Sequence, residues 1–217
     1  MSQILILVGI STLQTLEMVL FSTLFSMVIG FPLGVLLYST NSMGITPRPI
    51  LNQVLSRIVN VLRSFPFIIL MILLFPLSRL ILGTSIGTTA TIIPLSIAAA
   101  PFVARLVETA LLEVDPGMIQ AARAMGSTNS QIIYKVLIPE SMPSLVSGIT
   151  LTIINLIGYS AMAGTIGGGG LGDLAIRYGY QRFRPDVIAA SVVVIIVMVE
   201  VIQFIGTRIA NRMLANR

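Results

Sequence analysis

Five long apolar runs, broken only by isolated polar residues, dominate the chain. Each approaches the roughly 20 residues that an α-helix needs to cross the hydrocarbon core of a bilayer. We therefore expect an all-α integral membrane protein with five transmembrane helices. Their approximate bounds are Leu13 to Tyr38, Ile58 to Leu82, Thr88 to Leu111, Pro143 to Met162 and Asp186 to Thr207.

The composition supports a chain whose main solvent is lipid. Hydrophobic residues make up 55% of it and charged residues only 10%, against about 25% charged residues in an ordinary soluble domain. There is no Cys and no His, which removes disulfides and the commonest zinc ligands. The 13 basic residues are scattered, whereas a nucleic-acid interface gathers them on one face. We expect the lipid bilayer as a partner, and no nucleic acid, metal or cofactor.

The basic residues also predict the orientation of the spans. With the C-terminus in the cytoplasm, nine basic residues fall inside and four outside, which agrees with the positive-inside rule. The residues from Met1 to Gly9 lack the basic region of a signal peptide, so the N-terminus is expected to be retained. We predict a multi-pass inner-membrane protein, N-terminus outside and C-terminus cytoplasmic, with a single transmembrane domain over residues 1–217.

The segment from Glu113 to Met142, between the third and fourth spans, is less apolar and contains residues that typically begin and end helices. Asp115 followed by Pro116 predicts a helix start, and Gly126 a helix end. Thr128 and Gln131 have the spacing of a capping box, and the second helix is expected to end at Pro139. The loop is therefore predicted to be two short helices joined by a glycine turn.

A rigid helix pair beneath a membrane bundle has two readings. It is a docking element for another protein, whose surface could approach the small residues Ala121, Ala122 and Gly126 closely, while Arg123 makes directional charged contacts. Alternatively, it is an amphipathic pair lying on lipid. The residues themselves leave both open.

The same loop resembles the EAA loop of ABC-type importer permeases. The resemblance rests on QAARAMG at residues 120–126 and VLIP at residues 136–139, with Gly126 and Pro139 at the separation typical of that family. Gln120 stands in place of the usual Glu and keeps the capacity to form hydrogen bonds. The resemblance implies that the loop docks on the ATP-binding subunit, and we call residues 113–142 the coupling loop. The implied coupling residues are Gln120, Ala121, Ala122, Arg123, Met125, Gly126 and Pro139.

About half of the chain, from Gly83 to Arg182, resembles methionine-import ABC permeases, through AAPFVARLVETALLEV at residues 99–114 and GYSAMAGTIGGGGLGDLAIRYGYQRF at residues 158–183. The resemblance implies type I importer architecture and methionine as substrate, in the L and possibly the D form. It also implies a permease homodimer, two cytoplasmic ATP-binding subunits and an extracytoplasmic methionine-binding protein or lipoprotein.

The fourth span carries a polar or small stripe at helical spacing. Gly148, Thr152, Asn155, Tyr159 and Met162 follow at steps of four, three, four and three residues, which places them on one face. Such a stripe either packs helices together or lines a translocation path. We favour the path for Thr152, Asn155, Tyr159 and Met162, and by the resemblance Met162 is a candidate gate.

Other candidate chemistry is sparse. Gly167, Gly169 and Gly172 fit a G-x-G-x-x-G spacing, but a membrane span precedes them, and an external loop from Gly164 to Gly172 is the better interpretation. The chain has no Walker A motif, so ATP hydrolysis is expected on another polypeptide. No nucleophile–base pair or metal-ligand cluster indicates an enzyme.

Three carboxylates lie in or near the spans, where charge is expensive. Glu108 is three residues from Arg105, so the two are expected to neutralise each other. Glu17 is another of the three. Glu200 is a candidate proton-relay group, and it sustains the alternative of an ion-coupled secondary transporter.

Overall fold

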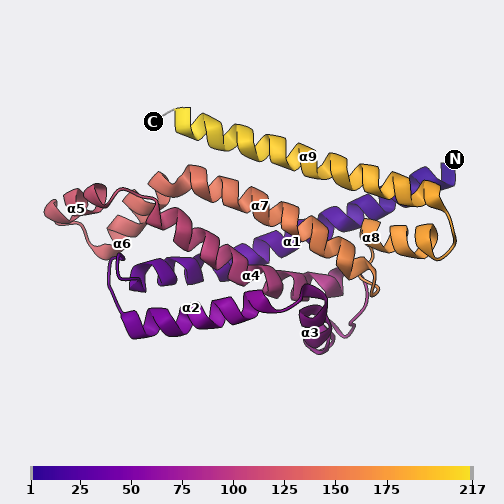
Figure 1. Cartoon of the computed structure of the whole chain (residues 1–217), viewed down its shortest axis with the longest axis horizontal. Helices are drawn as coiled ribbons and strands as arrows, with labels where there is room; N and C mark the ends of the chain where they lie inside the picture. The colour runs from indigo at the N-terminus through magenta and orange to yellow at the C-terminus, as the bar shows by residue number, and fades with distance from the viewer. Residues whose placement is uncertain (1, 216–217) are drawn as a thin grey trace.

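The computed structural model describes residues 2–215 of the chain, and the side chains of residues 4–215. Within this part all regular elements are helical, and four helices are long and apolar enough to span a membrane, or five spans if the bent pair α2–α3 counts as one. The predicted all-α membrane fold is confirmed. The elements are α1 (Ser2–Thr40), α2 (Pro49–Ser64), α3 (Phe67–Leu82), α4 (Thr88–Leu112), α5 (Pro116–Ala124), α6 (Asn129–Ile132), the π-helical η1 (Ile133–Leu137), α7 (Ile138–Gly164), α8 (Gly170–Leu174), the π-helical η2 (Ala175–Tyr180) and α9 (Pro185–Ala215) (Figure 1).

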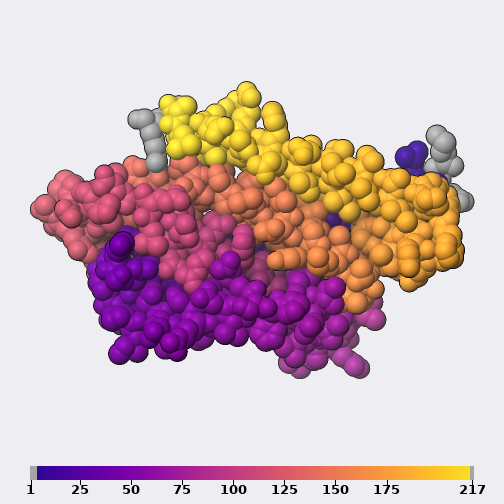
Figure 2. Space-filling view, in the orientation of Figure 1, coloured from indigo at the N-terminus to yellow at the C-terminus, as the bar shows by residue number. Residues whose placement is uncertain are grey.

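The helices form an elongated bundle whose two ends are built from different elements. Figure 1 shows α5 and α6 at one end, beside the C-terminal end of α9, while the N-terminal end of α1 and α8 lie at the other. We call the first the coupling-loop end. In Figure 2, α9 lies along the side of α7, and the coupling loop projects beyond the bundle. In their most apolar windows α4 is 67% buried and α9 only 6%, so α4 is the central helix and α9 a peripheral one.

Close packing of α1 on α4 depends on two glycines one helical turn apart. A Cβ added at Gly30 would lie 2.6 Å from the carbonyl oxygen of Ala100, and one at Gly34 equally close to that of Ala104. Small residues four apart allow membrane helices to approach backbone to backbone, where dispersion contacts replace the missing hydrophobic force. This seam therefore fixes how α1 and α4 pack.

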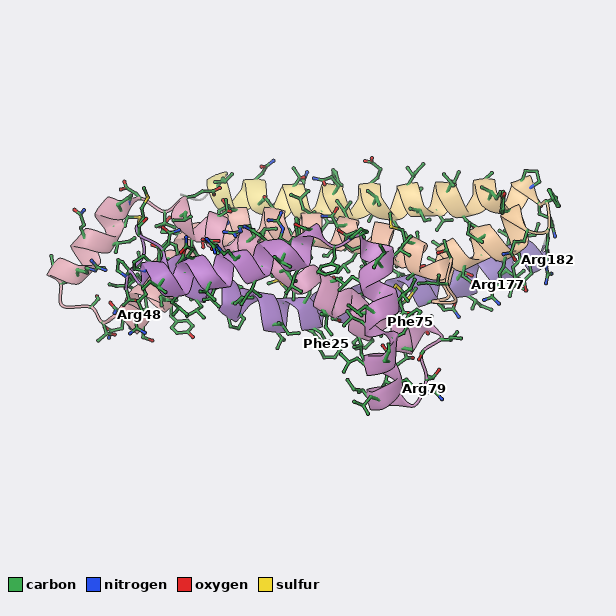
Figure 3. All side chains as sticks on the ribbon, turned by 60° about the horizontal axis from the view of Figure 1, so that its bottom comes forward. Phe25, Arg48, Phe75, Arg79, Arg177 and Arg182 are labelled. Atoms are coloured by element: carbon green, nitrogen blue, oxygen red, sulfur yellow. The ribbon has the colours of Figure 1, made fainter. Side chains whose placement is uncertain are left out.

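The predicted second span, Ile58 to Leu82 as one helix, is wrong. The structure has two helices, α2 and α3, at 103° to each other. Phe65 is extended, with φ −67° and ψ 132°, because the ring of Pro66 disfavours the helical region for the residue before it. Pro66 also has no N–H to continue the helix. Figure 3 shows α3 projecting from the bundle, with Arg79 at its far end.

The glycine-rich segment between α7 and α9 is only partly a loop. Residues 165–169 connect the helices, but α8 begins at Gly170, earlier than the loop prediction allowed. The first amide groups of a helix have no partner within it. Here Gln14 and Thr15 of α1 supply acceptors, to the N–H of Gly170 at 3.0 Å and of Leu171 at 2.9 Å. Side chains distant in sequence therefore cap α8.

Candidate functional site

The first helix of the coupling loop has the boundaries predicted for it. The Asp115 side chain accepts a hydrogen bond from the N–H of Gly117 at 2.7 Å, and Pro116 follows at the first helical position. At the other end, the N–H of Ser127 donates to the carbonyl of Ala122 and that of Gly126 to the carbonyl of Arg123. This is a Schellman end, and Gly126 adopts the required left-handed conformation, with φ +80°.

The second helix of the loop begins as predicted but does not end at Pro139, so that boundary is wrong. The capping box of Thr128 and Gln131 is present in both directions. The chain then continues as one helical span from Asn129 to Gly164, through the π turn η1. In a regular α-helix the proline ring would meet the carbonyl four residues earlier. The wider π turn precedes Pro139, and the N–H of Ile138 donates to the carbonyl of Ile133.

The expected coupling residues divide between two faces of α5. Ala122 is buried, in a cluster with Tyr38, Leu111 and Ile132 from three other elements. Arg123 donates through Nη2 to the carbonyl of Ile45 at 2.9 Å, so its guanidinium ties α5 to the connection between α1 and α2.

The remaining expected residues face outward. Gln120, Ala121, Gly126 and Pro139 are exposed, and the side chain of Met125 is 79% exposed. The outward face of the loop therefore consists of small, polar and flexible apolar groups.

Two further exposed side chains of the loop were missed by the sequence analysis. Tyr134 is 70% exposed and Met118 is 40% exposed. Flexible methionines and exposed aromatics are the side chains that protein interfaces favour. The exposure of Tyr134 could have been predicted from helical periodicity, because Tyr134 lies between Ile132 and Leu137, which both face inward.

The stripe on α7 serves different roles along its length. Gly148 packs against Leu106 of α4, whose Cδ2 a Cβ would approach to within 1.8 Å. Thr152 is buried, and its hydroxyl donates to the carbonyl of Gly148. These two positions pack helices. Tyr159 is half-buried and stacks on Phe67 of α3, with ring centroids 4.4 Å apart and planes 7° apart.

Asn155 and Met162 are exposed on the surface of α7, and Met162 is 45% exposed. Within the part of the chain that the structure describes, the Asn155 amide makes no hydrogen bond. An amide at membrane depth is unfavourable against lipid. This position therefore favours an aqueous path or another subunit over hydrocarbon as the neighbour of Asn155.

Replacing Asn155 tests whether its side chain lies on the translocation path. We expect Asn155→Leu to lower ATP-dependent uptake while leaving the expression and elution profile of the purified protein unchanged, because the amide holds no contact within the described chain. Asn211→Leu, the same substitution at an exposed position of α9, provides the matched control and should leave uptake unchanged. Unchanged uptake by Asn155→Leu would remove this residue from the path.

A groove not anticipated from the sequence lies between α2, α4 and α7. Its volume is about 380 Å³, and its polar lining includes Arg105, Thr109, Glu113, Ser144 and Ser147. Ser144 donates to Oε2 of Glu113 at 2.5 Å. These residues come from the part of α4 and α7 nearest the coupling loop. The groove therefore places these polar side chains among apolar ones near that end of the bundle.

The expected pair of Arg105 and Glu108 is present. Nη1 of Arg105 lies 2.6 Å from Oε2 of Glu108, whose residue surface is 3% exposed. Nη2 of Arg105 also donates to the Asn60 side chain at 3.0 Å, which joins α2 to α4. In contrast, Glu17 and Glu200 are exposed.

Breaking this pair from one side should destabilise the protein more than removing both charges. Arg105→Met leaves the buried Glu108 carboxylate without its cation, at a cost of about 3–5 kcal/mol. The double variant Arg105→Met/Glu108→Leu should recover most of that loss. Thermal unfolding followed by size-exclusion chromatography measures both. A double variant no more stable than the single one would show that the pair itself is required.

Residues 30–215 match the model of the family described as binding-protein-dependent transport system inner membrane component. The chain belongs to this family. The predicted resemblance is confirmed, and the family is one of membrane-embedded transport subunits of the inner membrane.

Individual members of the family are similar over most of their length. The chain is 50% identical to the probable D-methionine transport system permease protein MetI of Vibrio cholerae, across 93% of this chain and 90% of the relative. It is also 50% identical to the methionine import system permease protein MetP of Bacillus subtilis, across 81% and 79%. A solved chain of the MetNI methionine ABC transporter, in an inward-facing conformation, aligns with a TM-score of 0.96 and 46% identity, across 98% of this chain and 99% of that one. The type I importer architecture is thereby confirmed, and the secondary-transporter alternative is not favoured.

Proposed function

We propose that this chain is the permease subunit of an ABC importer that carries methionine, in the L and the D form, inward across the inner membrane. Two copies form the permease, and two cytoplasmic ATP-binding subunits supply the energy. An extracytoplasmic methionine-binding protein or lipoprotein delivers the substrate. The names of the relatives from Vibrio cholerae and Bacillus subtilis support the substrate, and the similarity to a MetNI chain supports the assembly.

One structural observation carries the mechanism. The helical span from Asn129 to Gly164 is continuous, so it joins the coupling loop directly to the face of α7 that holds Asn155 and Met162. Closure of the ATP-binding subunits displaces the loop, and a continuous helix transmits that displacement along its length. The buried Ala122 and the hydrogen bond from Arg123 to Ile45 couple α5 to the same motion.

The outward residues Gln120, Ala121 and Met125 form the proposed contact with the ATP-binding subunit. Their small and flexible side chains allow close approach, and the Gln120 amide supplies a hydrogen bond. Gly126 and Pro139 set the shape of the loop. On α7, Thr152 packs the path helix, Asn155 and Tyr159 border the path, and Met162 is the proposed gate near its outer end.

The proposed orientation places the N-terminus outside and the coupling loop in the cytoplasm. The supporting observations are the excess of basic residues at the coupling-loop side, nine against four, and the position of α5 and the C-terminal end of α9 at one end of the bundle (Figure 1). Labelling of a C-terminal tag only after membrane permeabilisation would support this orientation. Labelling in intact spheroplasts would overturn it.

Reconstitution tests the proposed function. Proteoliposomes that contain this chain, its ATP-binding subunit and the methionine-binding protein should take up radiolabelled methionine only when ATP is present. Liposomes with this chain alone should not. Uptake by the chain alone in response to an ion gradient would instead support a secondary transporter and direct attention to Glu200.

A further inference from the structure

One cation within the spanning region has no anion beside it. Arg63 lies in the last turn of α2, and its Cζ is 6.0 Å from the ring centroid of Phe102. Phe102 is about 21 Å along α4 from Thr88, at roughly 1.5 Å per residue, and so lies within the span, in the half nearer the coupling loop. None of the three ion pairs in the described part of the chain includes Arg63. Charged groups at such depth are expensive and mark ligand pathways.

Arg63 borders a cavity at the break between α2 and α3. The cavity measures about 260 Å³, and its lining includes Arg63 together with Phe65, Phe67, Phe102 and Tyr159. Backbone without regular structure is tolerated at membrane depth where it is buried in protein or lines a cavity. The extended Phe65, which precedes Pro66, borders this cavity.

The cavity adjoins the larger groove between α2, α4 and α7, because Arg63 and Phe102 line both. Arg63 thus lies at the border between the chamber with aromatic walls near the α2–α3 break and the groove that contains Thr109, Glu113 and Ser144. A solute that leaves the chamber for the groove passes this guanidinium.

We propose that the chamber is an intramembrane substrate site that holds an amino acid by its α-carboxylate on Arg63, with a thioether side chain among the aromatic rings. A guanidinium pairs with carboxylate through two parallel hydrogen bonds. A thioether sulfur makes favourable contacts with aromatic rings, and Phe67 and Tyr159 already stack as one wall. The last carbonyl groups of α2 have no N–H donors within the helix, so they can accept hydrogen bonds from the α-ammonium group of the amino acid. This inference rests on the proposed methionine transport, and it identifies one site at which methionine binds on its way through the membrane.

Direct binding tests the site without the binding protein. The permease complex with its ATP-binding subunits, in nanodiscs, is titrated with radiolabelled L-methionine. Arg63→Gln should weaken binding at least tenfold, about 1.4 kcal/mol. Arg63→Lys should lose less, because it keeps the charge but not the planar fork. Arg79→Gln, at the exposed end of α3 (Figure 3), should bind as the unmodified complex does.

Competition identifies the group that Arg63 recognises. Methioninol, which lacks the carboxylate, should displace methionine poorly from the unmodified complex, and Arg63→Gln should abolish that preference. The ratio of the two affinities is independent of the fraction of folded protein. An unchanged ratio in Arg63→Gln would overturn the site, as would loss of the permease dimer with carboxylate preference intact, which would assign Arg63 to the subunit interface.

Uptake by the complete unmodified system separates the two proposals. If ATP-dependent methionine uptake occurs and the carboxylate preference depends on Arg63, both stand. If uptake occurs but the unmodified complex shows no binding, or binding independent of Arg63, the site is wrong and the proposed function remains. If the complete system takes up no methionine, the proposed function fails, and the site fails with it as a methionine site.

Discussion

Gly126→Pro should abolish coupled transport while the permease still assembles. Gly126 has φ +80°, which proline, fixed near −65°, does not adopt. The substitution also removes the N–H that donates to the carbonyl of Arg123. The turn between α5 and α6 must therefore change shape, and the outward residues of the loop move with it. We expect methionine uptake to fall roughly tenfold or more, equivalent to at least about 1.4 kcal/mol of lost coupling.

Uptake and ATP hydrolysis are measured together in proteoliposomes, because uncoupling lowers the ratio of methionine imported to ATP hydrolysed. Gly126→Asn is the matched control. Asparagine tolerates the left-handed region, and no described atom lies within 4 Å of a Cβ at this position. Asn should therefore retain most of the uptake. Normal coupling in Gly126→Pro would show that the loop transmits motion without this turn.

Gly34→Val should prevent the bundle from assembling. A Cβ at this position would lie 2.6 Å from the carbonyl oxygen of Ala104 and equally close to Cβ of Val107. The seam between α1 and α4 must open along its length to accommodate the side chain, and overpacking of this kind costs typically about 1–3 kcal/mol or more. Because α4 also packs against α2, α3 and α7, its displacement disturbs those contacts as well.

The measurement is the yield of monodisperse protein in detergent and its midpoint of thermal aggregation. Gly9→Val is the matched control on the same helix, since nothing within the described structure lies within 4 Å of a Cβ there. That variant should behave as the unmodified protein does. Equal loss of yield in both would mean that valine disturbs insertion of α1 rather than the seam.

The start of both helices of the coupling loop and the end of the first followed from the sequence, because helix capping is local chemistry. Asp115 caps an amide two residues away, Thr128 one three residues away, and Gly126 ends α5 through its own backbone conformation. Each of these signals lies within one turn of the boundary that it specifies. The apolar runs likewise predicted the long helices, because their length alone satisfies the bilayer.

The effect of each proline on its helix could not be predicted from the neighbouring sequence. Pro32, Pro94 and Pro101 lie inside continuous helices, as do Pro76 and Pro143, whereas Pro66 separates α2 from α3 at 103°. The residue type is the same in all six places. Neighbouring helices decide whether the freed carbonyl groups are satisfied along a straight helix. At Pro66 the structure instead gains the stack of Phe67 on Tyr159 and the cavity beside Arg63.

The sequence by itself determined the membrane class, the start of both helices of the coupling loop and the end of the first, because each depends on residues close together in the chain. Only the tertiary structure decided that Arg123 holds Ile45, that Gln14 and Thr15 cap α8, and that Arg63 has aromatic rings but no carboxylate beside it. Each of these is a contact between residues far apart in sequence. Such contacts depend on how whole helices pack, a collective outcome that no single segment specifies.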